Sequence, residues 1–221
     1  MKLGFIGTGN MAGAIIGGII KNRIFRPEEI IGADVSEAGL QRVKDTYGIE
    51  VTDNNRKVAA EAEVLVLSVK PQYYEEVIHS IRDCLRREQI IITIAPGKTL
   101  AWLEEQFAKS VKIVRTMPNT PALVGEGMTA ACANENVTEE EKEYVLKILS
   151  SFGKVEMIPE HLMDAVVAVS GSAPAYVFLF IEAMADAAVS EGMARQQAYL
   201  FAAQAVYRSY GGCGSIRGDD K

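Results

Sequence analysis

Residues 3–20 of this chain read LGFIGTGNMAGAIIGGII, and this stretch decides the fold. The apolar run 2–7 predicts a buried strand and residues 10–21 predict a helix, with a glycine turn between them. The turn, Gly7-Thr8-Gly9-Asn10-Met11-Ala12, fits G-x-G-x-x-[G/A] in the strand-turn-helix context that this pattern requires. We therefore expect a dinucleotide-binding turn here.

A dinucleotide-binding turn needs a small residue at each of three positions, for a different physical reason at each. Gly7 permits the tight turn, Gly9 lets a pyrophosphate approach the backbone, and Ala12 keeps the helix close to the sheet. Free N–H groups at the helix start then face the phosphates. The uncharged stretch after Lys2 also resembles a signal peptide, but its six glycines argue against an apolar helix.

Outward from this turn, segments with the pattern of a strand alternate with segments with the pattern of a helix. Apolar, β-branched runs predict further strands, and segments with helical spacing separate them; a last strand is a candidate at 153–158. Such alternation predicts an α/β fold with a Rossmann-type, doubly wound, mostly parallel sheet. The predicted strands are 29–34, 49–52, 63–69, 89–95 and 111–115, and the predicted helices include 37–47 and 138–151, the latter with Thr138 and Glu141 as a capping box.

After Pro159 the pattern becomes helical, so we predict a dinucleotide-binding domain over 1–159 and a smaller all-helical domain over 160–221. The uncharged run 165–181 is shorter than a membrane span needs and contains Pro174, so a buried helix pair is the better interpretation. In the helix 174–191, Glu182, Asp186 and Ser190 form one narrow polar stripe. Such a helix favours a subunit interface, with packing inside one chain as the alternative.

Composition excludes several classes of function. The 221 residues carry 23 Lys+Arg and 29 Asp+Glu, a net charge of −6, which argues against nucleic acid and anionic membranes as partners. The three cysteines, Cys84, Cys132 and Cys213, lie far apart and fit a reducing cytoplasm. With two histidines in the chain, we expect no multi-histidine metal site.

Loops at the carboxyl ends of the predicted strands are the expected ligand edge. Asp34 ends the second strand, where an acidic side chain bonds the ribose hydroxyls of NAD and repels a 2′-phosphate, so the sequence favours NADH without excluding NADPH. Arg42 and Lys44 could offset that charge, although solvated surface positions are the simpler interpretation. Lys70 either reaches a phosphate or ribose or is solvated, and Asn119 either orients the nicotinamide amide or caps its own turn.

Four segments together resemble pyrroline-5-carboxylate reductase: GFIGTGNMA, SVKPQ, RTMPNTPALVGEGMT and VSGSAPAYVF. The likeness runs in order from residue 1 to about 206, and RTMPNTP and SGSAPAY are the specific motifs. The resemblance implies a Rossmann domain followed by a helical domain that dimerises. It also implies reduction of the C=N bond of Δ1-pyrroline-5-carboxylate to L-proline by NAD(P)H, the last step of proline biosynthesis.

The resemblance also implies site residues. With Thr8 and Asn119 from the turn and loop above, the cofactor set comprises Gly7, Thr8, Gly9, Asn10, Met11, Asp34, Asn55, Val69, Lys70, Pro71 and Asn119. The segment bordering the substrate comprises Ser170, Gly171, Ser172, Ala173 and Pro174. A cyclic imine is electrophilic already, so hydride transfer needs orientation more than a general base, and we assign no catalytic side chain.

The family continues with further helices and a Ser-Pro-Gly-Gly-Thr-Thr loop that holds the substrate carboxylate, whereas this chain ends in YRSYGGCGSIRGDDK. We expect this tail not to form a core helix and the C-terminal part to be incomplete. Two alternatives therefore stay open. One is a dinucleotide-binding protein without turnover. The other is a two-domain hydroxyacid dehydrogenase, although 160–193 lack the lysine that it would need.

Overall fold

A computed structural model describes residues 2–216, with side chains described as far as Tyr207. Backbone packing divides the chain into two units, Met1–Gly171 and Ser172–Lys221, and each is described by itself. The helical segment begins at Glu160, whereas the second unit begins at Ser172. The domain boundary expected near Pro159 therefore stays a prediction.

One sheet in the first unit confirms the predicted α/β architecture. Its strand order is β3-β2-β1-β4-β5-β6-β7-β8, and β1 to β6 run parallel. The order reverses at β1, which lies between β2 and β4, so the sheet is doubly wound from its first strand. The strands are β1 (Leu3–Ile6), β2 (Ile30–Ala33), β3 (Glu50–Thr52), β4 (Val64–Leu67), β5 (Ile90–Thr93), β6 (Lys112–Met117), β7 (Gly127–Ala133) and β8 (Gly153–Met157).

Strand β7 is absent from the sequence-based prediction. It runs antiparallel to β6 and parallel to β8, with Arg115 opposite Cys132. Its sequence, GMTAACA, is rich in alanine and glycine, which have weak strand propensity. The hydrogen bonds offered by β6 and β8 on its two sides decide its conformation, and a local pattern cannot reveal them.

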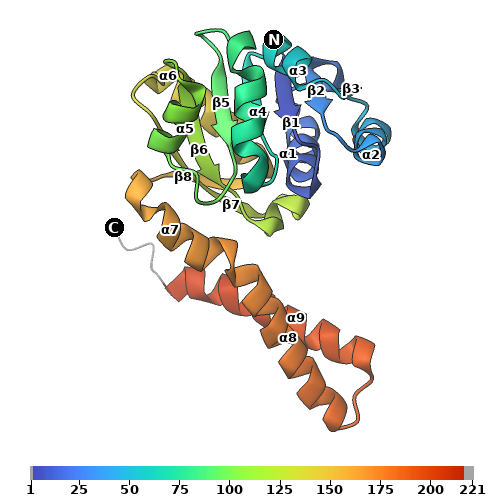
Figure 1. The fold of residues 1–221 in the computed structure, drawn as a ribbon. Helices are drawn as coiled ribbons and strands as arrows, with labels where there is room; N and C mark the ends of the chain where they lie inside the picture. Colours follow the sequence, from blue (N-terminus) through green and yellow to red (C-terminus); the bar gives the residue numbers. More distant parts are fainter. Residues whose placement is uncertain (1, 217–221) are drawn as a thin grey trace. The chain divides into compact units, whose positions relative to one another are not determined.

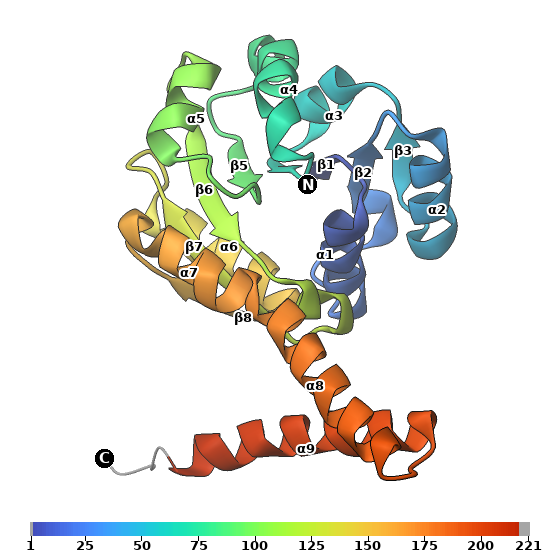
Figure 2. The same ribbon diagram turned by 60° about the horizontal axis from the view of Figure 1, so that its bottom comes forward.

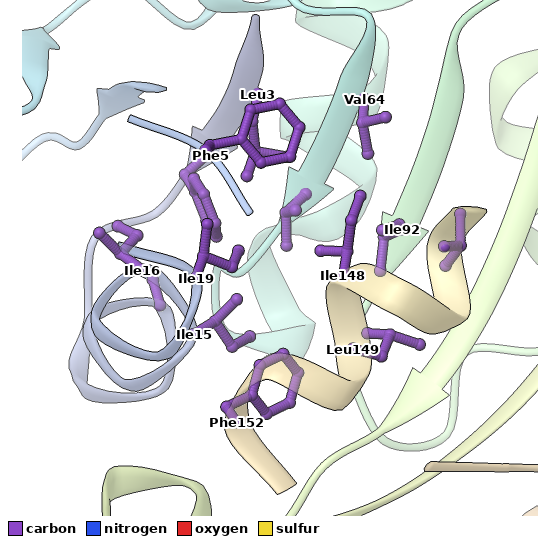
Figure 3. Packing of buried hydrophobic residues seen from close by; sticks show 14 of the residues in the cluster. Leu3, Phe5, Ile15, Ile16, Ile19, Val64, Ile92, Ile148, Leu149 and Phe152 are labelled. Carbon is purple, nitrogen blue, oxygen red and sulfur yellow. The ribbon is translucent and has the colours of Figure 1, made fainter. Parts of the chain in front are cut away.

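Helices cover both faces of the sheet. The helices α1 (Asn10–Lys21), α2 (Glu37–Tyr47) and α6 (Glu139–Leu149) pack in one apolar cluster, and α3 (Asn55–Glu61), α4 (Tyr74–Ile81) and α5 (Leu100–Phe107) pack in the other. Figure 1 shows α4 and α5 in front of β5 and β6. In Figure 3, Phe5 of β1, Ile15 and Ile19 of α1 and Ile148 of α6 point toward one another. The strand β1 is therefore held in the centre of the apolar core, and the turn that follows it starts from this buried strand.

The helical segment that begins at Glu160 includes α7 (Met163–Val166) and a π-helical turn, Val167–Gly171, within the first unit. In the second unit, α8 (Ala173–Ser190) and α9 (Arg195–Ile216) form a helical hairpin (Figure 2). The two helices contact each other through small side chains, since the buried residues between them are Ala185, Ala198 and Ala202.

The hairpin departs from the sequence-based expectations at two points. A buried helix pair was expected, yet the large apolar side chains of α8 and α9 are exposed, for example Phe178 at 69% and Phe201 at 69%. The two helices of the second unit therefore do not cover this apolar surface by packing on each other. Helix α9 also continues to Ile216, past the expected helix end near 207, because extending a formed helix costs less than nucleating one. The last five residues of the tail lie outside the described residues.

Among the described residues, one helical stretch, Glu160–Ser190, is long and apolar enough to cross a membrane by length and composition alone. An uncovered helix of a subunit interface passes the same test, so the finding carries no assignment to a membrane.

Candidate functional site

The glycine turn after β1 is fixed by its neighbours. Gly7 has φ +94°, and a Cβ there would lie 2.6 Å from the carbonyl oxygen of Ser68. The Ser68 hydroxyl donates to the Gly7 carbonyl oxygen at 2.6 Å, which ties the end of β4 to the turn. Only glycine suits this position, since a side chain would be strained in φ and would strike backbone atoms.

Gly9 differs from Gly7 in the space around it. A Cβ on Gly9 would meet no protein atom within 4 Å, and Gly9 is the N-cap of α1 with no side-chain cap. The first turn of α1 contains no acidic residue. The open position therefore lies beside a helix start with free N–H groups and a positive dipole end, which suits a diphosphate.

Asp34 and Thr8 form a hydrogen-bonded pair at the end of β2. Asp34 Oδ2 accepts from the Thr8 backbone N at 2.6 Å and from Thr8 Oγ1 at 3.0 Å, and Oδ1 accepts from the backbone N of Ser36 at 3.0 Å. Thr8 is fully buried. Its two donors are thus engaged by Asp34, so Thr8 orients the carboxylate, and Arg42 Nη2 donates to the Thr8 carbonyl oxygen at 3.2 Å.

A cavity of about 470 Å³ opens beside this pair. Asp34 and Asn55, both expected at the cofactor, line it together with Gly7 and Val69, so the structure brings four predicted residues from separate segments to one place. Its mixture of apolar walls and a carboxylate suits an adenosine, whose base is flat and whose ribose carries hydroxyls. The lining is completed by Ile6, Val35, Tyr73, Glu76, Val77 and Ser80.

Tyr74 fixes the carboxyl ends of two neighbouring strands. Its buried hydroxyl donates to the Leu67 carbonyl oxygen at 2.5 Å and accepts from the backbone N of Ile94 at 3.3 Å. Burial raises the pKa of this phenol far above its ordinary value, so it stays a donor throughout the physiological range. This side chain therefore adds a bridge between the carboxyl ends of β4 and β5, which the sheet already pairs.

The loop after β6 brings Asn119 to the helical segment. Asn119 Oδ1 accepts from the backbone N of Met128 at 2.8 Å, and Nδ2 donates to Ser170 Oγ at 3.0 Å and to the Ser170 carbonyl oxygen at 3.3 Å. Both ends of the amide are thus engaged within the first unit. Of the predicted substrate segment, Ser170 and Gly171 belong to that unit and Ser172, Ala173 and Pro174 to the second.

The start of the helical segment, at Glu160, is anchored to strand β6. Arg115 Nη1, on β6, donates to Glu160 Oε1 at 2.7 Å, and the same oxygen accepts from the backbone N of Leu100 at 2.7 Å. Burial, with a smaller contribution from Glu160, raises the pKa of the neighbouring Cys132 thiol to about 11. Cys132 is therefore a core side chain rather than a nucleophile.

The remaining expected residues fall around the same edge. Asn10 lies at the start of α1 with an exposed side chain and Met11 is half-buried, while Lys70 is exposed and Pro71 half-buried in the loop after β4. Sequence reasoning missed Ser68, Tyr74 and the orienting role of Thr8. The motif SVKPQYY contains two of them, but its local pattern does not reveal that they bond strands far away in the sequence.

Two family models match the chain. The family described as NADP oxidoreductase coenzyme F420-dependent matches residues 2–97, and the family described as pyrroline-5-carboxylate reductase dimerisation matches residues 160–211. The first range holds the glycine turn and the adenosine-sized cavity, and the second holds the helical hairpin with its exposed apolar side chains.

Individual relatives agree with these matches. The chain is 45% identical over 208 residues to pyrroline-5-carboxylate reductase of Escherichia coli (strain K12), which covers 94% of this chain and 77% of that protein. It is similar to the structure of pyrroline-5-carboxylate reductase from Coxiella burnetii, with TM-score 0.89, 34% identity, and coverage of 100% of this chain and 81% of that one. The Plasmodium falciparum pyrroline carboxylate reductase, solved with NADP bound, gives TM-score 0.88, 34% identity and coverage of 100% and 80%.

Proposed function

Because the chain belongs to the pyrroline-5-carboxylate reductase family, we propose that its glycine turn and the cavity beside Asp34 hold NAD(P)H for reduction of Δ1-pyrroline-5-carboxylate to L-proline. The activity and cofactor class are those of the family, which serves proline biosynthesis. The observation that carries the site assignment is the open Gly9 position at an uncapped helix start, next to an adenosine-sized cavity.

Each part of the edge then has a task. The N–H groups at the start of α1 bind the diphosphate, and Asp34 and Asn55 face the adenosine. Lys70 and Pro71, in the loop after β4, border the path of the cofactor toward β5 and β6. Ser170–Pro174 border the substrate.

The chemistry needs orientation rather than a dedicated base. When bound, the reduced nicotinamide supplies a hydride to the ring carbon of the C=N bond. The chain's own contribution is to fix the carboxyl ends of β4, β5 and β6, so that the two rings meet at the reacting distance. A hydroxyl or a water near the substrate segment supplies the hydrogen bond to the imine nitrogen.

The geometry of Asp34 supports NADH as the preferred cofactor. Three donors hold the carboxylate at the end of β2, where the adenosine ribose lies in this fold, and its charge repels a 2′-phosphate. Arg42 is engaged by the Thr8 carbonyl oxygen, which reduces its availability to a phosphate.

A second copy of this chain is the proposed protein partner. Residues 160–211 match the dimerisation family, and exposed aromatic side chains of α8 and α9 have no cover within the described chain. We place the enzyme in the cytoplasm, in keeping with the free thiols of Cys84 and Cys132.

The deciding experiment is a steady-state assay of NADH and NADPH oxidation with Δ1-pyrroline-5-carboxylate, with proline measured in the same samples. We expect one proline for each cofactor oxidised and a higher kcat/KM with NADH. Cofactor binding without proline formation would instead favour the dinucleotide-binding protein. Turnover of a hydroxy acid but not of the imine would favour the dehydrogenase.

A further inference from the structure

The π-helical turn Val167–Gly171 is the least regular part of the helical segment. It separates α7 from α8, whose hydrogen bonds follow the ordinary α pattern. A π turn has poorer hydrogen-bond geometry than an α turn, and such turns persist where neighbouring contacts hold them, often at functional sites. The contacts around this turn therefore show what the fold uses it for.

Asn119 is the polar contact that reaches the turn. Its Oδ1 faces the backbone N–H of Met128, which can only donate, so the orientation of the amide is fixed and Nδ2 faces Ser170. Nδ2 then donates to both the hydroxyl and the carbonyl oxygen of Ser170. One half-buried side chain thus joins β7, the loop after β6 and the π turn.

Met117 adds an apolar contact at the same place. A Cβ on Gly171 would lie 3.4 Å from Met117 Cε, so the methyl group rests against the backbone of the turn. Met117 also packs with Met163 and Val166 of α7. Residues 117 and 119 both contact the turn; Met117 is the last residue of β6 and Asn119 lies two positions later, at the ligand edge.

We propose that Asn119 is a positioning residue, which sets Ser170 and the π turn in register with the cofactor edge through its two hydrogen bonds. The inference rests on the proposed function, because it assigns Ser170 to the substrate side. It differs from a direct contact of Asn119 with the nicotinamide, since the amide here acts through Ser170. Substitution of Asn119 should then disturb the substrate more than the cofactor.

The first arm of the test is kinetic. We expect Asn119→Leu, which removes its bonds to Met128 and Ser170, to lower kcat/KM for Δ1-pyrroline-5-carboxylate by about tenfold to a hundredfold while the Kd for NADH changes less than about threefold. Asn119→Asp is the conservative variant. Its carboxylate still accepts from Met128 and can accept from the Ser170 hydroxyl, but it cannot donate to the Ser170 carbonyl oxygen, so activity should be rescued in part. In a Ser170→Ala background that rescue should disappear, because no hydroxyl remains to donate.

The second arm needs no turnover. Amide hydrogen exchange of residues 167–171 should slow when NADH binds to the wild-type chain, and should be about tenfold faster in Asn119→Leu, while NADH still protects residues 7–12. The matched control is Asn136→Leu. Asn136 Nδ2 likewise donates to a backbone carbonyl, that of Val111, but at the opposite end of β6. The Asn136→Leu variant should have a lower Tm but an unchanged rate of amide hydrogen exchange at residues 167–171.

Three outcomes would overturn the proposal. A loss of NADH affinity in Asn119→Leu equal to the loss of kcat/KM would make Asn119 a cofactor ligand. An unchanged exchange rate of residues 167–171 in Asn119→Leu would show that Asn119 does not hold the π turn. Equal activity of Asn119→Asp with and without the Ser170 hydroxyl would show that Asn119 does not act through Ser170. If the wild-type chain binds NADH but does not reduce the imine, the proposed function fails, and the exchange arm still decides the role of Asn119.

Discussion

The two units of this protein differ in how their apolar side chains are covered. In the first unit, Phe5, Phe107 and Phe152 are at most 1% exposed. In the second, Phe178, Phe201 and Tyr207 are 69 to 70% exposed. Burying one such side chain stabilises a fold by about 1.5–3 kcal/mol, so the first unit has a large apolar core, whereas the second buries a small alanine cluster and leaves further stabilisation available to a partner. The difference supports the proposal that the first unit binds the cofactor and the second mediates assembly with another copy.

The strongest way to break this comparison is to fill the open position of the first unit. Gly9→Val places a branched side chain where the diphosphate approaches, and we expect the Kd for NADH to rise at least about a hundredfold. Because a Cβ at Gly9 meets no protein atom, Tm should stay nearly unchanged. Isothermal titration with NADH measures the first effect and calorimetry the second.

The matched control is Gly13→Ala on the same helix. Its Cβ would lie 3.6 Å from Tyr47 Oη, an ordinary contact, and alanine favours a helix over glycine. This variant should bind NADH normally. An unchanged NADH affinity in Gly9→Val would remove the cofactor assignment itself.

The second test acts on the other unit. Phe178→Asp puts a charge on the exposed apolar face of α8, and we expect the dissociation constant of the dimer to rise about thirtyfold or more. Sedimentation measures it, with Glu182→Gln on the polar stripe as the control. The affinity of the monomer for NADH should remain within about twofold, because the first unit has its own large apolar core. A joint loss of assembly and cofactor binding would contradict the separation of the two units.

The third test sharpens the description of the cofactor edge. Asp34→Ser removes the charge at the end of β2, and we expect the ratio of kcat/KM for NADPH to that for NADH to rise about tenfold, which is about 1.4 kcal/mol of relative binding. Steady-state assays with both cofactors measure this ratio. Asp53→Ser, an exposed acidic position near the same edge, is the control. An unchanged ratio would mean that Asp34 serves the turn and not the ribose.

The smallest effect is expected at the opposite end of the sheet. Burial is the largest single influence on the pKa of Glu141 and would raise it, but the hydrogen bonds from Lys112 and Thr138 and the charge of Lys112 together outweigh burial and lower this pKa below the ordinary value of 4.5. A carboxyl whose pKa is lowered by folding stabilises the fold above pH 4.5 and loses that contribution as the pH falls through its folded pKa.

Glu141→Gln should therefore cost about 1 kcal/mol of unfolding free energy at neutral pH, and the difference should shrink as the pH falls below 4.5. Urea unfolding at several pH values measures it. The Kd for NADH should not change, because Glu141 lies away from the glycine turn. A cost that stays constant down to acid pH would show that packing, and not the ion pair, is responsible.

Much of the first unit could be predicted because its signals are local. The strand β1, the turn at Gly7 and the helix α1 follow one another in sequence, and a buried strand or helix carries its period in its own residues. The capping box of α6 is equally local, and the structure contains it, with Thr138 N donating to Glu141 Oε2 at 3.0 Å. Strand β7 escaped prediction since its conformation depends on neighbours on both sides.

The sequence predicts residues of the candidate site but not the contacts that hold them in place. Asp34 and Asn55 were expected at the cofactor and line one cavity. Ser68 and Tyr74 were not expected, because their bonds to Gly7 and to Leu67 and Ile94 depend on how the strands and the turn pack together. The exposed face of α8 shows the same limit, since apolar periodicity predicts burial but does not say which chain provides it.

The sequence by itself determined the parallel sheet, the dinucleotide-binding turn and the family, because each is encoded in short runs of neighbouring residues. Only the tertiary structure decided that Thr8 holds Asp34, that Asn119 holds Ser170 and that the apolar hairpin is left uncovered. Those facts depend on contacts between segments distant in the chain, and such contacts are set by how the elements pack rather than by any local pattern.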